Sequence, residues 1–336
     1  MPRCCGRRLS RWRPPVASVR AEARLPRRIL VIFNPAAGRG RSRAKRLSRV
    51  VAELERRGCL VTVLSTRAPG DAERLAREAD LAFDLIVAAG GDGTVNEVAN
   101  GIFAASRPLA VLPIGTGNVL ANEIGLPRDP RRLARVIANG TPRPIWPGRA
   151  GDRLFLATTG VGFDAEVLGA LDPWLKRRLG KLGYIWAILL CLCRYRRSEF
   201  VVGTDGGAYR AASAIVTTGR LYAGRFVIAP DARLDVPLLH IVLFQSAGRL
   251  AVLRYLGAML LGRLHRLADV SILTARRASI AAGKPAAAGP SVVEIDGEVH
   301  GRLPLAVEIA ANPLLLVQPG RRVACDQSNR TAAPLV

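Results

Sequence analysis

The chain has 336 residues and a formal net charge of +24, from 50 basic and 26 acidic side chains. This length is typical of two domains, and the charge favours acidic partners such as anionic lipid headgroups, nucleotides or nucleic acid, without choosing between them. The longest apolar run, at 184–193, has about half the length that a helix needs to cross a bilayer. The six cysteines form no CxxC pair and no disulfide framework, which indicates reduced thiols in a cytoplasmic protein rather than a disulfide-stabilised secreted domain.

The first part of the chain has the pattern of an α/β domain. Residues 1–27 are rich in arginine and proline and predict a disordered basic tail. Between 28 and 141, apolar runs typical of buried strands alternate with runs whose apolar residues recur at helical spacing. The predicted strands are 28–34, 59–66, 83–90 and 108–115, and the predicted helices include 47–54, 70–79 and 94–105. This alternation predicts a Rossmann-like, three-layer α/β domain with a parallel sheet.

The composition changes near residues 140–153, where prolines and glycines end the alternation. Many short strand-like runs separated by turn residues follow, and they predict a mostly antiparallel β-sandwich domain over 142–317. Two stretches that we expect to be helical, 173–195 and 248–262, interrupt these runs. Residues 318–336 form a polar C-terminal tail that could pack back on the first domain.

Three glycine-rich turns follow strands of the first domain: NPAAGRG at 34–40, GGDGTVNE at 90–97 and GTGN at 115–118. Because the carboxyl ends of parallel strands lie at one edge of a sheet, we expect the three turns to face one crevice. Glycine lets main-chain N–H groups approach an anion closely, and the start of a helix adds unpaired N–H groups and a positive dipole end. The turns therefore predict a phosphate-binding site, although they have neither the P-loop spacing nor the dinucleotide-binding spacing of glycines.

These blocks, in this order, resemble the catalytic domain of diacylglycerol kinases. More narrowly, the chain is similar over residues 27–317 to the bacterial lipid kinases related to diacylglycerol and sphingosine kinases. The resemblance implies that ATP binds between the two domains and that a lipid hydroxyl group is phosphorylated. The nucleotide contacts that it implies are Asn34, Thr66, Gly90, Gly91, Asp92, Gly93, Thr94, Val95, Asn96 and Thr116.

A second motif, VVEIDGEVHG at 292–301, resembles the DGE motif of the same family. The resemblance makes Glu298 the proton acceptor, and Asp296 stands two residues before it. Two carboxylates on a tight turn could divide the tasks of phosphoryl transfer, which needs a base and neutralisation of charge by Mg²⁺. Without the glycine-rich turns upstream, a plain hairpin turn with solvated charges would be the better interpretation.

Asp92 is the third acidic candidate. A carboxylate beside a phosphate repels it unless a cation lies between them, so we expect Asp92 to coordinate Mg²⁺ or to hold the base in place. Related sphingosine kinases make the matching aspartate the base itself. We therefore rank Glu298 ahead of Asp92 as the base and keep Asp92 as the alternative.

Two positions depart from the family pattern. The structural Mg²⁺ site of the family matches DVPLLH at 235–240, with Asp235 and the carbonyl groups of Arg233 and Leu238 as ligands, but Val236 stands where a carboxylate is expected. Val119 follows Asn118 where many relatives have an aspartate. A relative that binds nucleotide without catalysis is therefore one alternative.

The sequence thus predicts an ATP- and Mg²⁺-dependent lipid kinase that is cytoplasmic and associates peripherally with an anionic membrane surface through its basic side chains. We expect no nucleic-acid partner, since aromatic residues are sparse and the usual recognition motifs are absent. A homodimer is possible. The alternative with the same chemistry is a kinase of a water-soluble acceptor, as in the distantly related NAD kinases.

Overall fold

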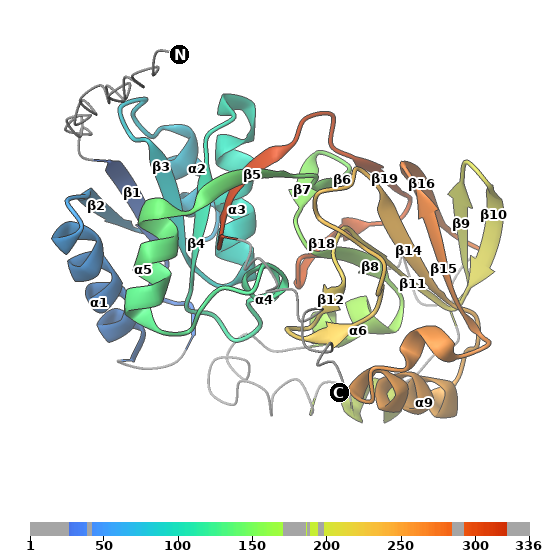
Figure 1. The fold of residues 1–336 in the computed structure, drawn as a ribbon. Helices are drawn as coiled ribbons and strands as arrows, with labels where there is room; N and C mark the ends of the chain where they lie inside the picture. Colours follow the sequence, from blue (N-terminus) through green and yellow to red (C-terminus); the bar gives the residue numbers. More distant parts are fainter. Residues whose placement is uncertain are drawn as a thin grey trace, which may run out of the picture.

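The structure is a computed structural model, and it describes residues 27–38, 42–170, 186, 189–193, 198–283 and 292–320. Nearly all of the predicted basic tail 1–27, most of the predicted helix 173–195 and most of the predicted tail 318–336 lie outside these residues. The described residues form two domains, an α/β domain and a β-rich domain, which lie side by side (Figure 1).

The first domain is built on a six-stranded sheet with the order β2-β1-β3-β4-β20-β5. Its strands are β1 (Arg28–Phe33), β2 (Leu60–Ser65), β3 (Leu85–Gly90), β4 (Leu109–Pro113), β5 (Thr141–Ile145) and β20 (Leu314–Gln318). The first four strands and β20 run parallel, and only β5 is antiparallel to its neighbour. The predicted parallel α/β sheet is therefore confirmed.

Helices cover both faces of this sheet. Alternate residues of the central strands divide between two apolar clusters, because successive strand side chains point to opposite faces. Helices α1 (Ser42–Arg56) and α5 (Pro130–Asn139) pack against one face, and α2 (Asp71–Arg77) and α3 (Asp92–Ile102) pack against the other. The result is the three-layer arrangement that the sequence predicts.

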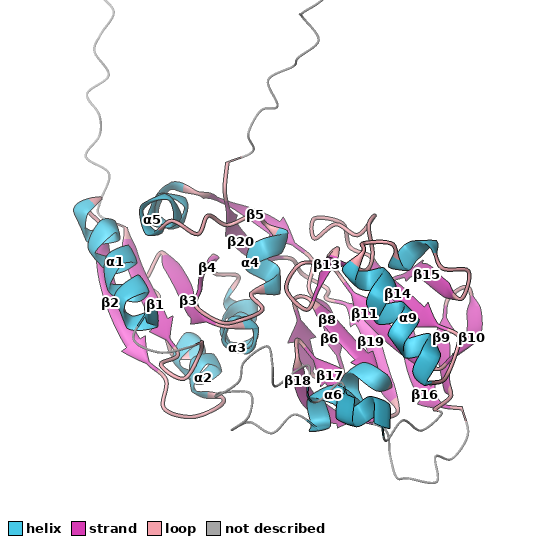
Figure 2. Ribbon diagram, turned by 90° about the horizontal axis from the view of Figure 1, so that it is seen from below, coloured by secondary structure: helices cyan, strands magenta, loops and turns pink. Residues whose placement is uncertain are grey.

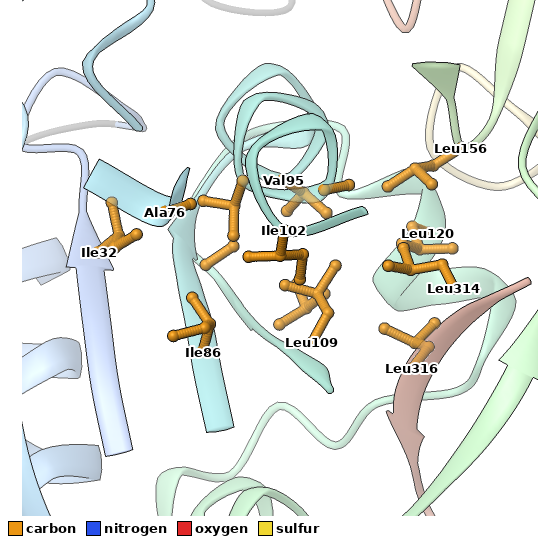
Figure 3. Close-up of a cluster of buried hydrophobic side chains, with 14 of the residues drawn as sticks. Ile32, Ala76, Ile86, Val95, Ile102, Leu109, Leu120, Leu156, Leu314 and Leu316 are labelled. Atoms are coloured by element: carbon orange, nitrogen blue, oxygen red, sulfur yellow. The ribbon is translucent and has the colours of Figure 1, made fainter. Parts of the chain in front are cut away.

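The strand β20 lies far from its sheet neighbours in the sequence. Residues 314–317, assigned from the sequence to the second domain, pair with β4 and β5 in the first sheet (Figure 1). Residues 142–145, assigned likewise, form most of β5. Leu314 and Leu316 are fully buried in the apolar cluster between the sheet and helices α2 and α3. There they lie beside the labelled side chains of Leu109 and Leu120 (Figure 3). The chain therefore leaves the first domain and returns to complete its sheet.

The second domain consists of two six-stranded sheets, with the orders β10-β9-β16-β19-β6-β7 and β15-β14-β11-β8-β17-β18. Every strand pair in them is antiparallel, and one apolar core lies between the sheets, so the β-sandwich prediction is confirmed. The strands are β6 (Gly148–Ala150), β7 (Arg153–Phe155), β8 (Thr158–Val161), β9 (Phe200–Thr204), β10 (Gly207–Ala211), β11 (Ser213–Thr217), β14 (Leu239–Phe244), β15 (Val270–Ala275), β16 (Arg277–Ala282), β17 (Val292–Ile295), β18 (Glu298–Arg302) and β19 (Leu305–Ile309).

Short elements complete both domains. Helix α9 (Arg249–Leu260), close to the predicted 248–262, packs on the outer side of β14 and β15 (Figure 2). The remaining elements are α4 (Val119–Glu123), α6 (Phe163–Ala170), the hairpin of β12 (Leu221–Tyr222) and β13 (Phe226–Val227), and the 3-10 turns η1 (Phe103–Ala105) and η2 (Leu264–Arg266). Within the described residues, no helix has the length and apolar character that crossing a membrane requires. Cys59 and Cys193 are free thiols.

Candidate functional site

The turn after β1 is tied to the start of α3. Asn34 follows the last residue of β1, and its Nδ2 donates a hydrogen bond of 3.0 Å to Oγ1 of Thr94. The Oδ1 atom of Asn34 accepts a hydrogen bond of 2.8 Å from the N–H of Ala36 within the same turn. Asn34 therefore fixes the first glycine-rich turn against the helix that follows β3.

Glycine is required where the three turns meet. A Cβ atom at Gly90 would lie 2.4 Å from Oγ1 of Thr94, and one at Gly115 would lie 2.5 Å from the Cα of Gly91. Gly38 has a φ of 72°, and a Cβ there would lie 2.3 Å from the carbonyl oxygen of Ile114. Since these distances are too short for a Cβ atom, Gly38 and Gly115 let the three turns pack main chain against main chain, and Gly90 leaves room for the side chain of Thr94 at the start of α3.

The start of α3 forms the centre of this group of turns. Gly91 is the N-cap residue, with an extended main chain, and Asp92 is the first residue of the helix. The first N–H groups of a helix have no partner within it and carry the positive end of the helix dipole. Gly91 and Gly93 leave the approach to these N–H groups free of Cβ atoms, so the residues present fit the phosphate groups of a nucleotide.

Asp92 connects the second and third turns. Its Oδ1 accepts a hydrogen bond of 2.7 Å from the N–H of Val119, and its Oδ2 lies 2.8 Å from the position that a Cβ of Gly117 would take. Burial is the main cause that raises the pKa of Asp92, to about 6, and the charge of Asp296 raises it further. Main-chain N–H donors at the start of α4 act in the opposite direction and lower this pKa. No ion pair to Asp92 occurs in the described part of the chain. A partly buried carboxylate of this kind fits a divalent cation as its partner.

The motif IDGE forms a two-residue hairpin between β17 and β18. Asp296 has a φ of 47° and Gly297 a φ of 83°, and Ile295 pairs with Glu298 across the turn. Positive φ at both central residues is the geometry of a type I′ turn, for which Asp-Gly is a preferred sequence. The hairpin interpretation is therefore confirmed for the main chain, but the charge of Asp296 is not solvated, since only 8% of this residue is exposed.

Four N–H groups surround the carboxylate of Asp296. The main-chain N–H groups of Leu156, Ala157 and Thr158 donate to it at 2.8, 2.8 and 3.0 Å, and Nδ2 of Asn96 donates at 2.8 Å. Burial raises the pKa of Asp296, whereas these four donors stabilise its ionised form. The residue is saturated with hydrogen bonds inside the protein, so it holds the hairpin in place and presents no free oxygen to a substrate.

Asn96 links the two domains through its side chain. Its Nδ2 donates to Asp296 and, at 2.7 Å, to the carbonyl oxygen of Leu154. Its Oδ1 accepts from Nε of Arg153 at 3.0 Å and from Nδ2 of Asn100 at 3.1 Å. All four hydrogen-bonding positions of the amide are therefore in use. The nucleotide contact of Asn96 stays a prediction. In the structure, the Asn96 side chain binds and positions the carboxylate of Asp296.

The hairpin brings Glu298 to the start of α3. A Cβ atom at Gly93 would lie 2.3 Å from Oε1 of Glu298 and 3.0 Å from its Cδ, so the carboxyl group rests directly over the glycine. Glu298 is exposed, unlike Asp296 on the same turn. The structure therefore brings Glu298 to Gly93, the residue after Asp92, and Asp296 supports the hairpin that carries Glu298.

The other predicted nucleotide contacts differ in what they can offer. Thr116 is exposed on the third turn. Thr66 follows β2 and is buried, and its N–H donates a hydrogen bond of 2.9 Å to the carbonyl oxygen of Phe33. The side chain of Val95 packs into the core, as Figure 3 shows, so only its main chain could contact a nucleotide.

Hydrogen bonds between α4 and the β12–β13 hairpin connect the two domains, and no pattern in the sequence predicts them. In α4, Glu123 accepts hydrogen bonds from Nε of Arg220 at 3.0 Å and from the N–H of Leu221 at 2.8 Å. One residue earlier, Nδ2 of Asn122 donates to the carbonyl oxygens of Gly117 and Gly224. The third glycine-rich turn is thereby held against the β12–β13 hairpin of the second domain.

The predicted structural Mg²⁺ site does not have the groups that it needs. The carboxylate of Asp235 pairs with the guanidinium group of Arg233 at 2.8 and 3.0 Å, and the carbonyl oxygen of Arg233 accepts from the N–H of Val236 at 3.1 Å. No cluster of three acidic, histidine or cysteine side chains suited to a metal occurs among the described residues. Arg233, Asp235 and Leu238 therefore do not fit a structural Mg²⁺ ion, because an arginine already neutralises the one carboxylate.

Comparison with known protein families identifies both domains. Residues 28–150 match the diacylglycerol kinase catalytic domain, and residues 157–318 match the YegS C-terminal NAD kinase beta sandwich-like domain. The two matched segments divide the chain close to the boundary between its α/β and β-rich parts.

Similar proteins extend over most of the chain. The diacylglycerol kinase of Bacillus subtilis is 31% identical over 284 residues, which cover 83% of this chain and 92% of that protein. The diacylglycerol kinase of Mycobacterium tuberculosis is 28% identical over 300 residues, which cover 86% of this chain and 94% of that protein. A crystal structure of a diacylglycerol kinase from Bacillus anthracis has the same fold, with a TM-score of 0.67 at 22% identity, over 89% of this chain and 98% of that one.

Proposed function

Because the chain belongs to the diacylglycerol kinase catalytic-domain family, we propose that it is a lipid kinase that transfers the γ-phosphoryl group of ATP to a lipid hydroxyl group with the help of Mg²⁺. Diacylglycerol, or a lipid related to it, is the proposed acceptor. One observation carries the proposal: the carboxyl group of Glu298 rests over Gly93, at the start of the helix whose N–H groups suit a phosphate.

Glu298 is the proposed base. It is exposed at the start of β18, so its carboxylate can accept a proton from a hydroxyl group within hydrogen-bond reach. The hairpin that carries it cannot turn freely, because Asp296 is fixed by four hydrogen bonds. In phosphoryl transfer most of the catalytic effect comes from positioning and from stabilisation of charge, so this fixed placement supports the role.

The proposed nucleotide site lies on the first domain. The N–H groups at the start of α3 would hold phosphate oxygens, and the exposed Thr116 would lie beside them. Asp92 is the residue that would hold Mg²⁺, an ion that neutralises phosphate charge during transfer. Burial raises the pKa of Asp92, and a cation bound to its carboxylate would lower this pKa and favour the ionised form.

The place of action follows from the acceptor. A lipid substrate resides in a membrane, and the net charge of +24 favours an anionic membrane surface. We therefore propose a cytoplasmic protein that associates peripherally with such a surface. The predicted homodimer and the expected lack of a nucleic-acid partner stay predictions.

A kinase assay with a panel of acceptors tests the proposal. ATP consumption would be measured with diacylglycerol and related lipids in mixed detergent micelles, and with NAD and other water-soluble alcohols. We expect Mg²⁺-dependent turnover with at least one lipid and none with NAD. Turnover with NAD alone would support the soluble-acceptor alternative, whereas nucleotide binding without any turnover would support a relative that has lost catalysis.

A further inference from the structure

Helix α9 exposes a row of leucine side chains. Val252 and Tyr255 on one face of the helix are buried against the second domain. On the opposite face, the exposed fractions are 84% for Leu250, 51% for Leu253, 67% for Leu260 and 72% for Leu261. We call these four residues the α9 ridge.

The α9 ridge lies along one side of the helix. Its members stand at positions i, i+3, i+10 and i+11, with Gly257 at position i+7, and these spacings repeat one helical face. The face runs along all twelve residues of α9, or about 18 Å at 1.5 Å per residue. Single exposed leucines are ordinary on protein surfaces, but four of them on one face of a helix and its C-cap indicate a surface that contacts an apolar partner.

Basic side chains accompany the ridge. Arg249, Arg254, Arg263 and Arg266 are all exposed, and the one acidic residue between positions 246 and 270 is Asp269. Asp269 forms an ion pair with Arg254 and accepts a hydrogen bond of 2.5 Å from the hydroxyl group of Tyr255. Positive charge beside the ridge is therefore left uncompensated within this segment, which suits an anionic partner.

The segment 186–193 also exposes apolar side chains. Trp186 is 58% exposed and Leu189 is 51% exposed. The guanidinium group of Arg249 donates a hydrogen bond of 2.6 Å to the carbonyl oxygen of Cys193, which connects α9 to this segment. Tryptophan and leucine are side chains that favour the interface of a membrane.

Helix α9 lies on the side of the molecule that carries α4 (Figure 1 and Figure 2). Figure 1 shows α9 at the lower edge of the second domain and α4 between the two domains, and Figure 2, viewed from below, shows both helices. The third glycine-rich turn, which leads into α4, is part of the candidate site. A surface that bound α9 would therefore lie on the same side as the proposed site.

We infer that the α9 ridge docks on an anionic lipid membrane, with its leucines in the interfacial layer and Arg263 and Arg266 near the headgroups. Apolar side chains and basic side chains together give two signals for the same partner, whereas either one alone gives only weak binding. Such docking would bring a lipid kinase to its membrane-bound acceptor. Only this last statement rests on the proposed function.

Vesicle binding of the full chain tests the inference. The variant L250S/L261S removes two leucines that are mostly exposed, so the fold should be unaffected. The matched control is Leu81→Ser, since Leu81 is 86% exposed but lies in the first domain. Binding to phosphatidylcholine vesicles with and without phosphatidylglycerol would be measured by sedimentation. We expect binding to the anionic vesicles to weaken about tenfold in L250S/L261S and to stay unchanged in the control.

Outcomes of three kinds would overturn the inference, concerning the leucines, the charge and the oligomeric state. The first is equal binding of the wild type and L250S/L261S. The second is equal binding of the wild type and R263Q/R266Q, or no preference for phosphatidylglycerol. The third is a wild-type dimer that L250S/L261S converts to a monomer, which would make the ridge a contact between two copies of the chain.

A second measurement separates this inference from the proposed function. Turnover of a short-chain, water-soluble diacylglycerol requires the active site but no membrane, so we expect equal rates for the wild type and L250S/L261S. If the wild type turns over no acceptor at all, the proposed function fails, while vesicle binding still decides the role of the ridge. If only the ridge variant loses turnover of the soluble acceptor, the ridge belongs to the active site and the docking inference is wrong.

Discussion

The two sides of the candidate site are held in place by different means. On the first domain, three turns at the ends of neighbouring strands pack main chain on main chain, through Gly38, Gly91 and Gly115. On the second domain, one hairpin carries Glu298 and is held by a buried carboxylate, Asp296. The first side is fixed by the sheet to which it belongs, whereas the second depends on contacts between residues as far as 200 positions apart. We therefore expect a substitution of Glu298 to reduce turnover without a loss of stability, and a substitution of Asp296 to reduce the stability of the folded protein.

The largest expected effect is the loss of the base in Glu298→Gln. Removing a general base typically slows the chemical step by 10² to 10⁴, so we expect kcat to fall about a thousandfold. Because Glu298 is exposed, the free energy of unfolding and the affinity for ATP should be unchanged. Kinase assays, denaturant titration and nucleotide-binding titration measure the three quantities.

The matched control for this prediction is Glu78→Gln, which changes an exposed glutamate on the surface of the first domain. It should leave kcat unchanged. Near-normal turnover in Glu298→Gln would contradict the assignment and would make Asp92 the first candidate for the base.

The second effect concerns the support behind the base, in Asp296→Asn. An amide at this position turns a donor group toward N–H groups that need an acceptor, so buried donors lose their partners. Breaking a buried, charge-assisted network of this kind costs about 3 kcal/mol of stability. We expect urea unfolding to show this loss, and turnover to fall as the hairpin loses its fixed position.

The control is Asp152→Asn, since Asp152 lies exposed in the turn between β6 and β7. It should change the free energy of unfolding by less than about 0.5 kcal/mol. If Asp296→Asn is as stable as the wild type, the hairpin is held by other contacts and the difference between the two sides of the site disappears.

The same difference explains what could be predicted from the sequence. Strand ends and glycine-rich turns are local signals, so the parallel sheet and the position of each turn at a strand end follow from short stretches of sequence. The contact between Asn96 and Asp296 and the contact of Glu123 with Arg220 depend on how the two domains pack. Nothing near these residues in the sequence indicates their partners.

The strand β20 shows the same limit in the fold. Its apolar run predicts a strand but not a sheet, because a buried strand has the same composition in either domain. Pairing with β4 and β5 brings residues 314–318 into the first sheet. Asp296 is the comparable case in the site, since the motif IDGE predicts both acids on one turn but not that one is buried and the other exposed.

The third effect is a pH dependence on the first-domain side of the site, through Asp92. Its pKa of about 6 in the folded chain lies above the ordinary value of 3.8, so the folded state binds the proton more tightly than the unfolded state. The contribution of Asp92 to stability is therefore full at low pH and is lost as the pH rises from about 4 to about 6. The loss is about 2 kcal/mol, after allowance for partial exposure to solvent.

Comparison of the wild type with Asp92→Asn isolates this effect. Without Mg²⁺ or nucleotide, the variant should be the more stable protein by about 2 kcal/mol near pH 7.5, and the difference should shrink toward zero near pH 4. Urea titrations at the two pH values measure it. A difference that does not change with pH would contradict the raised pKa.

The smallest expected effect joins the two sides, in Gly93→Ala. The added Cβ would meet only the end of the flexible Glu298 side chain, at 2.3 Å from Oε1, so the carboxyl group must move away while the main chain need not. Alanine also favours a helix over glycine, so the free energy of unfolding should not fall. We expect kcat for a soluble short-chain acceptor to fall about tenfold, because a small displacement of a base strongly reduces proton transfer.

The control is Gly257→Ala, where a Cβ on helix α9 meets nothing within 4 Å, and it should keep full activity. If Gly93→Ala keeps full activity as well, the contact between Glu298 and the start of α3 has no part in turnover, and the two sides of the site work independently.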